Sequence, residues 1–100
     1  MTDEAVVHLT VHGRVQGVGY RAFVEHEAKR RDLRGWVRNC ADGTVEALLA
    51  GDAAVIEDMI GACRRGPFGA RVDAIDRTPG HASGLKERRA GQAFSVLPTI

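Results

Sequence analysis

Hydrophobic and polar residues alternate in several short runs of this sequence, and this two-residue period predicts strands. Near the start of the chain, Val7, Leu9 and Val11 alternate with more polar residues, so one face of that segment is expected to be buried. Short apolar runs bounded by turn residues predict the other strands. The five expected strands cover residues 5–12, 34–39, 44–50, 70–77 and 93–97. In 70–77 the alternation is imperfect, and the pattern does not define which residues face the core.

Two stretches have the three-to-four-residue spacing that is typical of helices. The first covers residues 21–31 and contains no glycine or proline. The second begins after Asp52, a favourable N-cap residue, and ends at Gly66-Pro67. Residues 79–91 are rich in glycine, serine and charge, which predicts a mobile loop.

The order strand, helix, strand, strand, helix, strand predicts the α+β class and a ferredoxin-like fold. This fold is an α/β sandwich in which both helices cover one face of an antiparallel sheet. Residues 1–100 are expected to form a single domain. In each strand–helix–strand unit the two strands run parallel. The C-terminal ends of strands 5–12 and 34–39 are therefore expected on the same side of the sheet.

Composition and charge exclude several classes of protein. Hydrophobic residues make up 44% of the chain and charged residues 27%, which is ordinary for a globular protein. The net charge is +1, so the overall charge does not favour binding to nucleic acid or to an acidic membrane. No apolar run approaches the roughly 20 residues of a membrane span. The first four residues are acidic and lack the features of a signal peptide, which indicates a cytoplasmic protein. Cys40 and Cys63 are expected as free thiols, with Cys63 in the core.

No metal site is expected from the histidines, and no binding site from the first two basic clusters. Four strand residues separate His8 from His12 by about 13 Å, which is too far for the two side chains to share an ion. Both side chains, and that of His26, are therefore expected at the surface. Basic residues also cluster at 29–31, 64–65 and 86–89. The first two clusters fall at helix C-termini, where positive charge complements the helix dipole, so a structural role is favoured.

The glycine-rich segment between the first strand and the first helix predicts an anion-binding loop. It reads Gly13-Arg14-Val15-Gln16-Gly17-Val18-Gly19-Tyr20-Arg21. Its glycines allow several backbone N–H groups to face one point, and the helix N-terminus adds unpaired donors. Arg21 adds a permanent charge that can hold two phosphate oxygens. Ala22 stands where G-x-G-x-x-G requires its last glycine, and no P-loop Gly-Lys-Ser/Thr follows. On glycine spacing alone, a tight turn that binds nothing stays an open alternative.

The polar residue Asn39 ends the strand 34–39, so Arg21 and Asn39 are expected to converge on one site. Around them the sequence provides no Ser/His/Asp or Cys/His set and no evident general base. A neutral amide can still hold a water molecule in line with a bound phosphorus, and phosphoryl transfer mainly requires positioning and charge stabilisation. Because no general acid is evident, the leaving group should depart unprotonated, as a carboxylate does. These residues indicate a mixed carboxylic–phosphoric anhydride as substrate.

Two segments of the sequence resemble the acylphosphatase family. Residues 13–21 match the first signature of the family. Gly35-Trp36-Val37-Arg38-Asn39, together with Asp42-Gly43-Thr44-Val45-Glu46, matches its second signature. The similarity extends over about residues 5–79 and returns at the last strand. The resemblance implies a ferredoxin-like fold, hydrolysis of acyl phosphates to carboxylate and phosphate, no metal or cofactor, and a small monomer.

The resemblance also assigns roles to individual positions. It places the phosphate-binding arginine on Arg21 and the water-orienting asparagine on Asn39. The implied phosphate-binding loop consists of Val15, Gln16, Gly17, Val18, Gly19 and Tyr20.

The sequence departs from the family at two places. Arg31-Asp32-Leu33 stands where Leu-Gly-Leu is usual, which affects how the first helix ends. Gly19-Tyr20 replaces a pair of bulky or aromatic residues, which makes the loop more flexible.

Two other classes of function stay open as alternatives. One is a nucleic-acid-binding module, because an RNA-recognition fold has the same element order. Such a module needs aromatic residues on its sheet, and the strand 44–50 has none. The other is a module that binds phosphate without turnover. The expected partner is a small acyl phosphate, with no nucleic acid and no membrane, and the sequence does not identify its acyl group.

Overall fold

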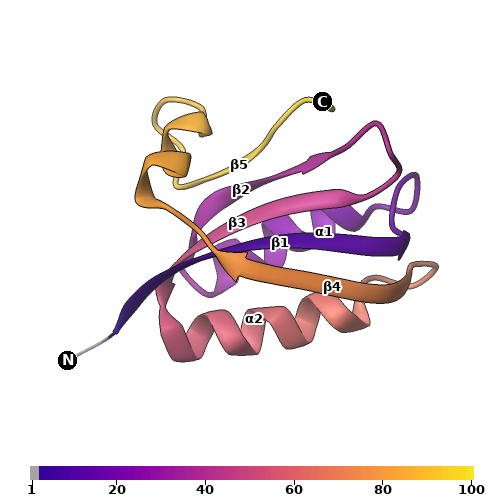
Figure 1. Cartoon of the computed structure of the whole chain (residues 1–100), viewed down its shortest axis with the longest axis horizontal. Coiled ribbons are helices and arrows are strands. Elements are labelled where there is room, and N and C mark those ends of the chain that lie inside the picture. The colour runs from indigo at the N-terminus through magenta and orange to yellow at the C-terminus, as the bar shows by residue number, and fades with distance from the viewer. Residues whose placement is uncertain (1–2) are drawn as a thin grey trace.

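One five-stranded sheet with two helices on the same face forms the described part of the chain, residues 3–100 of the computed structural model (Figure 1). The elements follow one another in the order β1 (Glu4–Arg14), α1 (Tyr20–Arg30), β2 (Arg34–Asn39), β3 (Val45–Asp52), α2 (Ala53–Arg65), β4 (Arg71–Pro79), the 3-10 helix η1 (Ala82–Glu87) and β5 (Phe94–Val96). Neither α-helix in this part of the chain is long and apolar enough to cross a membrane.

The sheet has the strand order β4-β1-β3-β2-β5. β1 pairs antiparallel with β3 and with β4, and β2 pairs antiparallel with β3. These four strands and the two helices confirm the predicted ferredoxin-like fold. β5 pairs instead in parallel with β2, so that Phe94 lies opposite Gly35 and Val96 opposite Val37. The complete sheet is therefore mixed rather than wholly antiparallel, because the short last strand is added at its edge.

The hydrophobic core lies between the sheet and the two helices. Val7, Leu9 and Val11 on β1 are no more than 9% exposed, which confirms the predicted buried face of this strand. The helices contribute the buried residues Tyr20, Val24, Ala28, Ile56, Met59, Ile60 and Cys63. Because α1 is buried along one side and follows β1 closely, its first turn is held at the end of that strand.

The imperfect alternation in β4 has a structural cause. The pairing of β1 with β4 is irregular between His12, which lies opposite Ala74, and Gly13, which lies opposite Val72. One residue of β4, Asp73, is therefore extra, as in a β-bulge. Gly13 has φ +129°, and a Cβ atom there would lie 2.1 Å from the carbonyl oxygen of Arg71. The bulge explains why the alternation predicted for 70–77 could not define a register.

Within the segment predicted as a mobile loop, residues 79–91, residues 82–87 form η1, which packs near the start of β2 on the face of the sheet opposite the α-helices (Figure 1). Trp36 on β2 donates a hydrogen bond from Nε1 to the carbonyl oxygen of Gly84, at 2.8 Å, and is only 3% exposed. Leu48 and Leu85 pack in the same small cluster. The prediction missed η1, because this helix forms through long-range packing that composition alone does not reveal.

The end of α1 shows the effect of the first departure from the family pattern. Asp32 has φ +56° and is the only non-glycine residue with a positive φ among residues 3–100. The backbone N–H groups of Asp32 and Leu33 donate to the carbonyl oxygens of Lys29 and Ala28, at 3.1 and 3.0 Å. Asp32 therefore adopts, in a helix-ending turn, the left-handed conformation that glycine adopts with least strain.

The histidines and cysteines take the positions expected of surface and core residues. The side chain of His8 is 27% exposed and lies 2.8 Å from Glu46, and that of His12 is 43% exposed and lies 2.8 Å from Asp76. His26 is 74% exposed. Cys63 is buried, Cys40 is half-buried, and both are free thiols. Within residues 3–100, no three side chains of the metal-binding types gather closely enough to hold an ion.

Candidate active site

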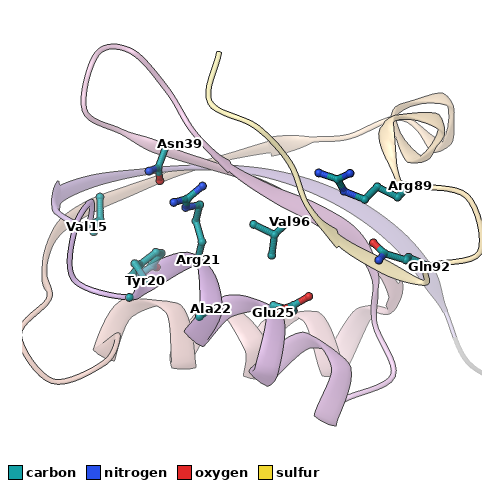
Figure 2. A pocket seen from close by; sticks show the side chains of 11 residues that line it. Val15, Tyr20, Arg21, Ala22, Glu25, Asn39, Arg89, Gln92 and Val96 are labelled. Atoms are coloured by element: carbon teal, nitrogen blue, oxygen red, sulfur yellow. The ribbon is translucent and has the colours of Figure 1, made fainter.

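A cavity of about 500 Å³ extends from the β1–α1 loop and the end of β2 to the segment before β5 (Figure 2). Five of its lining residues belong to the sequence-predicted loop and helix start: Val15, Gly17, Gly19, Tyr20 and Arg21. Asn39 lines the same cavity from the end of β2. The structure therefore brings together the two polar side chains that the element order was expected to bring together.

The β1–α1 loop requires glycine at two positions because of its backbone conformation. Gly17 has φ +75° and Gly19 has φ +80°, and a Cβ atom at either position would meet nothing within 4 Å. The requirement is therefore for positive φ rather than for space. Gly19 is the N-cap residue of α1, and no side chain caps this helix end. The unpaired N–H groups of the first turn of α1 are thus free to bind an anion at the cavity.

Tyr20 anchors the loop from beneath. Its side chain is 1% exposed, and its hydroxyl group donates a hydrogen bond to the carbonyl oxygen of Cys63 at 2.8 Å. Burial raises the pKa of Tyr20, and the proximity of Cys63 raises it further, so the hydroxyl group stays protonated and can donate. Cys63 lies in the last turn of α2, where carbonyl groups lack helical partners. The hydrogen bond thus satisfies one such carbonyl and fixes the loop to α2.

Gln16 fixes the other side of the loop. Its side-chain Nε2 donates to the carbonyl oxygens of Cys40 and Thr44, at 2.9 and 2.8 Å. These two residues belong to the turn between β2 and β3, directly after Asn39. Neither Gln16 nor Val18 lines the cavity. The side chain of Gln16 therefore serves to hold the loop against the strand end that carries Asn39.

Arg21 and Asn39 point toward one another across the cavity (Figure 2). The Oδ1 atom of Asn39 is buried and has no hydrogen-bond partner among residues 3–100. The backbone of Asn39 is held on both sides. It pairs with Val45 in the sheet, and its carbonyl oxygen accepts a hydrogen bond from the N–H of Ile100 at 3.1 Å. The unpartnered amide oxygen is thus fixed in position at the cavity.

The remaining lining residues are Ala22, Glu25, Arg89, Gln92 and Val96, none of which was predicted as a site residue. Glu25 follows Arg21 by four residues, so the sequence alone could have indicated that the two side chains share one face of the helix. Its carboxylate lies 3.1 Å from Lys29. Arg89 and Gln92 lie in an irregular segment before β5, and no sequence pattern indicates that they reach the cavity.

This architecture defines a ferredoxin-like α+β protein with a cavity lined by Arg21 and Asn39, and comparison with known proteins identifies its family. The model of the acylphosphatase family matches residues 7–89. An acylphosphatase of Rhodopseudomonas palustris (strain BisB18) is 57% identical over 95 residues, which are 95% of this chain and 96% of the relative. The chain belongs to the acylphosphatase family, a family of hydrolases.

Solved structures agree with this assignment. The crystal structure of acylphosphatase from Bacillus subtilis gives a TM-score of 0.79 at 35% identity and covers 92% of this chain and 97% of its own. The structure of an acylphosphatase from Coxiella burnetii gives a TM-score of 0.82 at 29% identity and covers 95% and 94%. The similarity therefore extends over nearly the whole of each chain.

Proposed function

We propose that this protein hydrolyses acyl phosphates to a carboxylate and inorganic phosphate, with Arg21 and the β1–α1 loop binding phosphate and Asn39 orienting the attacking water. The observation that carries the assignment is the buried, unpartnered Oδ1 of Asn39, which belongs to the same cavity as Arg21. A buried amide oxygen without a hydrogen bond is costly, so the site favours a water molecule that donates to it.

The phosphate end of the site combines backbone donors with one charged side chain. The loop of residues 15–20 and the uncapped first turn of α1 supply N–H groups, and Arg21 supplies a guanidinium group that makes no ion pair within residues 3–100. Charge on the phosphoryl oxygens is then stabilised by donors that are already in position, which lowers the barrier more than donors that must reorganise.

The chemistry at the phosphorus requires little acid–base help. The water oxygen attacks phosphorus, the bond from phosphorus to the acyl oxygen breaks, and the carboxylate leaves with the bonding electron pair. Both protons of the water stay on the phosphate product. Asn39 accepts one hydrogen bond from the water and so directs a lone pair of the water oxygen at phosphorus. Glu25 lies one helical turn beyond Arg21 and is paired with Lys29, so it takes no part in this step.

We further propose that residues 1–100 act as a single-domain, monomeric, cytoplasmic enzyme that needs no metal and takes a small molecule rather than nucleic acid or membrane as its partner. Positive charge at the cavity is available from Arg21 and Arg89. The unpaired thiols of Cys40 and Cys63 suit a reducing compartment. Light scattering after size-exclusion chromatography tests the monomer, and activity in the presence of a chelator tests the independence from metal.

The test of the reaction is hydrolysis of benzoyl phosphate by the wild type, Asn39→Ala and Arg21→Ala, with a phosphomonoester as control substrate. Asn39→Ala is expected to lower kcat by about 10²-fold or more while inorganic phosphate still inhibits, because the loop and Arg21 are intact. Arg21→Ala is expected to remove most phosphate inhibition together with nearly all activity. Equal losses of phosphate binding in both variants would contradict the separate roles. Binding of phosphate without turnover by the wild type would favour a binding module.

A further inference from the structure

The cavity contains a second arginine for which the cleavage of the phosphate bond provides no role. Arg89 lines the cavity from the segment between η1 and β5. In Figure 2 its guanidinium group is turned toward the Arg21 end of the cavity. Within residues 3–100, this guanidinium group makes no ion pair and no hydrogen bond; the backbone N–H of Arg89 is the group that is bonded. The charge of Arg89 is thus available to a ligand.

The position of Arg89 is fixed by a buried hydroxyl group. The backbone N–H of Arg89 donates to Oγ of Ser95 at 2.9 Å, and this Oγ donates in turn to Oε1 of Gln92 at 2.8 Å. The N–H of Gln92 donates to the carbonyl oxygen of Arg89 at 3.1 Å, which closes the turn. Ser95 lies on β5 and is fully buried. The turn that carries Arg89 is therefore built onto the sheet.

Arg89 approaches the cavity from the opposite end to Asn39. Because β5 runs parallel to β2 and Phe94 lies opposite Gly35, the residues that precede β5 lie near the start of β2. Asn39 ends that strand, four residues after Gly35, which corresponds to about 13 Å along a strand. Val96, which also lines the cavity, lies on β5 between these ends. A ligand that reaches both ends therefore needs a spacer, and Val96 offers it an apolar wall.

The charges around the cavity favour an anion at the Arg89 end. The carboxylate that lines the cavity, Glu25, is paired with Lys29 at 3.1 Å. This pair is neutral overall, so Arg21 and Arg89 leave the cavity with an excess of positive charge. Gln92 uses Oε1 to accept from Ser95, which leaves its Nε2 as a further donor at the cavity.

We propose that Arg89 recognises a second anionic group on the acyl part of the substrate. The preferred substrates are then acyl phosphates whose acyl chain carries a carboxylate or phosphate group at the end far from the reacting phosphorus. This inference rests on the proposed function, since it concerns the acyl group of the same substrate. Guanidinium groups bind both carboxylates and phosphates with paired hydrogen bonds, so the shared recognition is of an oxyanion.

The test compares benzoyl phosphates that differ only in the para substituent, which lies farthest from the acyl carbon. The substituents are carboxylate, phosphonate and the neutral carboxamide, which has nearly the shape of the carboxylate. In the wild type, kcat/KM should be higher for the charged compounds than for the carboxamide. Arg89→Gln should lower this ratio about tenfold, mainly through KM, because one charge-assisted contact is lost. Whichever of carboxylate and phosphonate shows the larger ratio identifies the preferred anion.

The matched control is Lys86→Gln, which removes the same charge from the same segment. Lys86 is exposed and does not line the cavity, so this variant should keep the wild-type ratio. Arg89→Glu should invert the preference toward the carboxamide. An unchanged ratio in Arg89→Gln would overturn the proposal. So would an equal loss for all three substrates with weaker inhibition by inorganic phosphate, because Arg89 would then bind the reacting phosphate. Failure of the wild type to hydrolyse any of them would instead overturn the proposed function.

Discussion

Replacement of Gln16 by glutamate tests whether its side chain holds the phosphate loop to the turn after β2. Gln16→Glu keeps the shape of the side chain but exchanges a donor group for a carboxylate oxygen. In the native position this oxygen would face two carbonyl oxygens, those of Cys40 and Thr44. Gln16→Ala is the matched variant, because it removes the donor without adding charge.

The expected cost follows from the other hydrogen bonds of the two carbonyl groups. The Cys40 oxygen also accepts from the N–H of Gly43 at 3.1 Å, and the Thr44 oxygen also accepts from the N–H of Cys40 at 2.9 Å. Neither carbonyl group is therefore left unpaired in Gln16→Ala, and two ordinary hydrogen bonds are lost, which lowers the free energy of unfolding by about 1–2 kcal/mol. Gln16→Glu adds repulsion between a half-buried carboxylate and two acceptors. It should cost about 1–2 kcal/mol more.

Urea unfolding followed by far-ultraviolet circular dichroism measures both costs, and their pH dependence provides the sharper check. Repulsion raises the pKa of the introduced carboxyl group above its ordinary value of about 4.3. The folded state then holds the proton more tightly than the unfolded chain. The extra destabilisation of Gln16→Glu over Gln16→Ala should be full near neutral pH and should shrink on acidification through the raised pKa. Equal stability of the two variants at all pH values would refute the proposed tether.

Three further predictions concern stability. Tyr20→Phe leaves the buried Cys63 carbonyl without its donor and should lower the free energy of unfolding by about 1–3 kcal/mol in urea titrations. Asp32→Gly relieves a left-handed conformation and should raise it by about 0.5–1 kcal/mol, and an unchanged value would mean that Asp32 is not strained. Although burial acts to raise the pKa of Glu46, hydrogen bonds from Arg38 and a histidine lower it. The stability that Glu46 contributes is thus fully present above a pH of about 4.3 and is lost as the pH falls through the lower pKa of Glu46 in the folded state. Acid titrations of Glu46→Gln should not show this loss.

The meeting of Arg21 with Asn39 was predictable because it depends on topology. Two parallel strands joined through one helix end on the same side of a sheet, so the ends of β1 and β2 lie near one another although β3 separates the two strands. The buried face of β1 was predictable for a similar reason, since its period of two is uninterrupted at Val7, Leu9 and Val11. The catalytic roles of Arg21 and Asn39 stay predictions, which the experiments proposed above test.

The other parts of the site depend on contacts that no short-range pattern contains. Arg89 reaches the cavity because Ser95 holds its turn onto β5, and η1 forms because Trp36 donates a hydrogen bond from the face of the sheet to Gly84. Each contact joins a segment without periodicity to a distant strand. Gln16 shows the same limit at smaller scale. Its place in the loop was predicted, but the direction of its side chain is set by acceptors in the β2–β3 turn.

The parallel pairing of β5 with β2 makes the Arg89 end of the cavity depend on the last strand of the sheet. Only a short ladder holds this strand, with Phe94 opposite Gly35 and Val96 opposite Val37. Arg21 lies on α1, and the sheet pairing of Asn39 is with Val45 on β3. A substitution that loosens β5 should therefore weaken discrimination between charged and neutral acyl groups more than it weakens hydrolysis of a simple acyl phosphate.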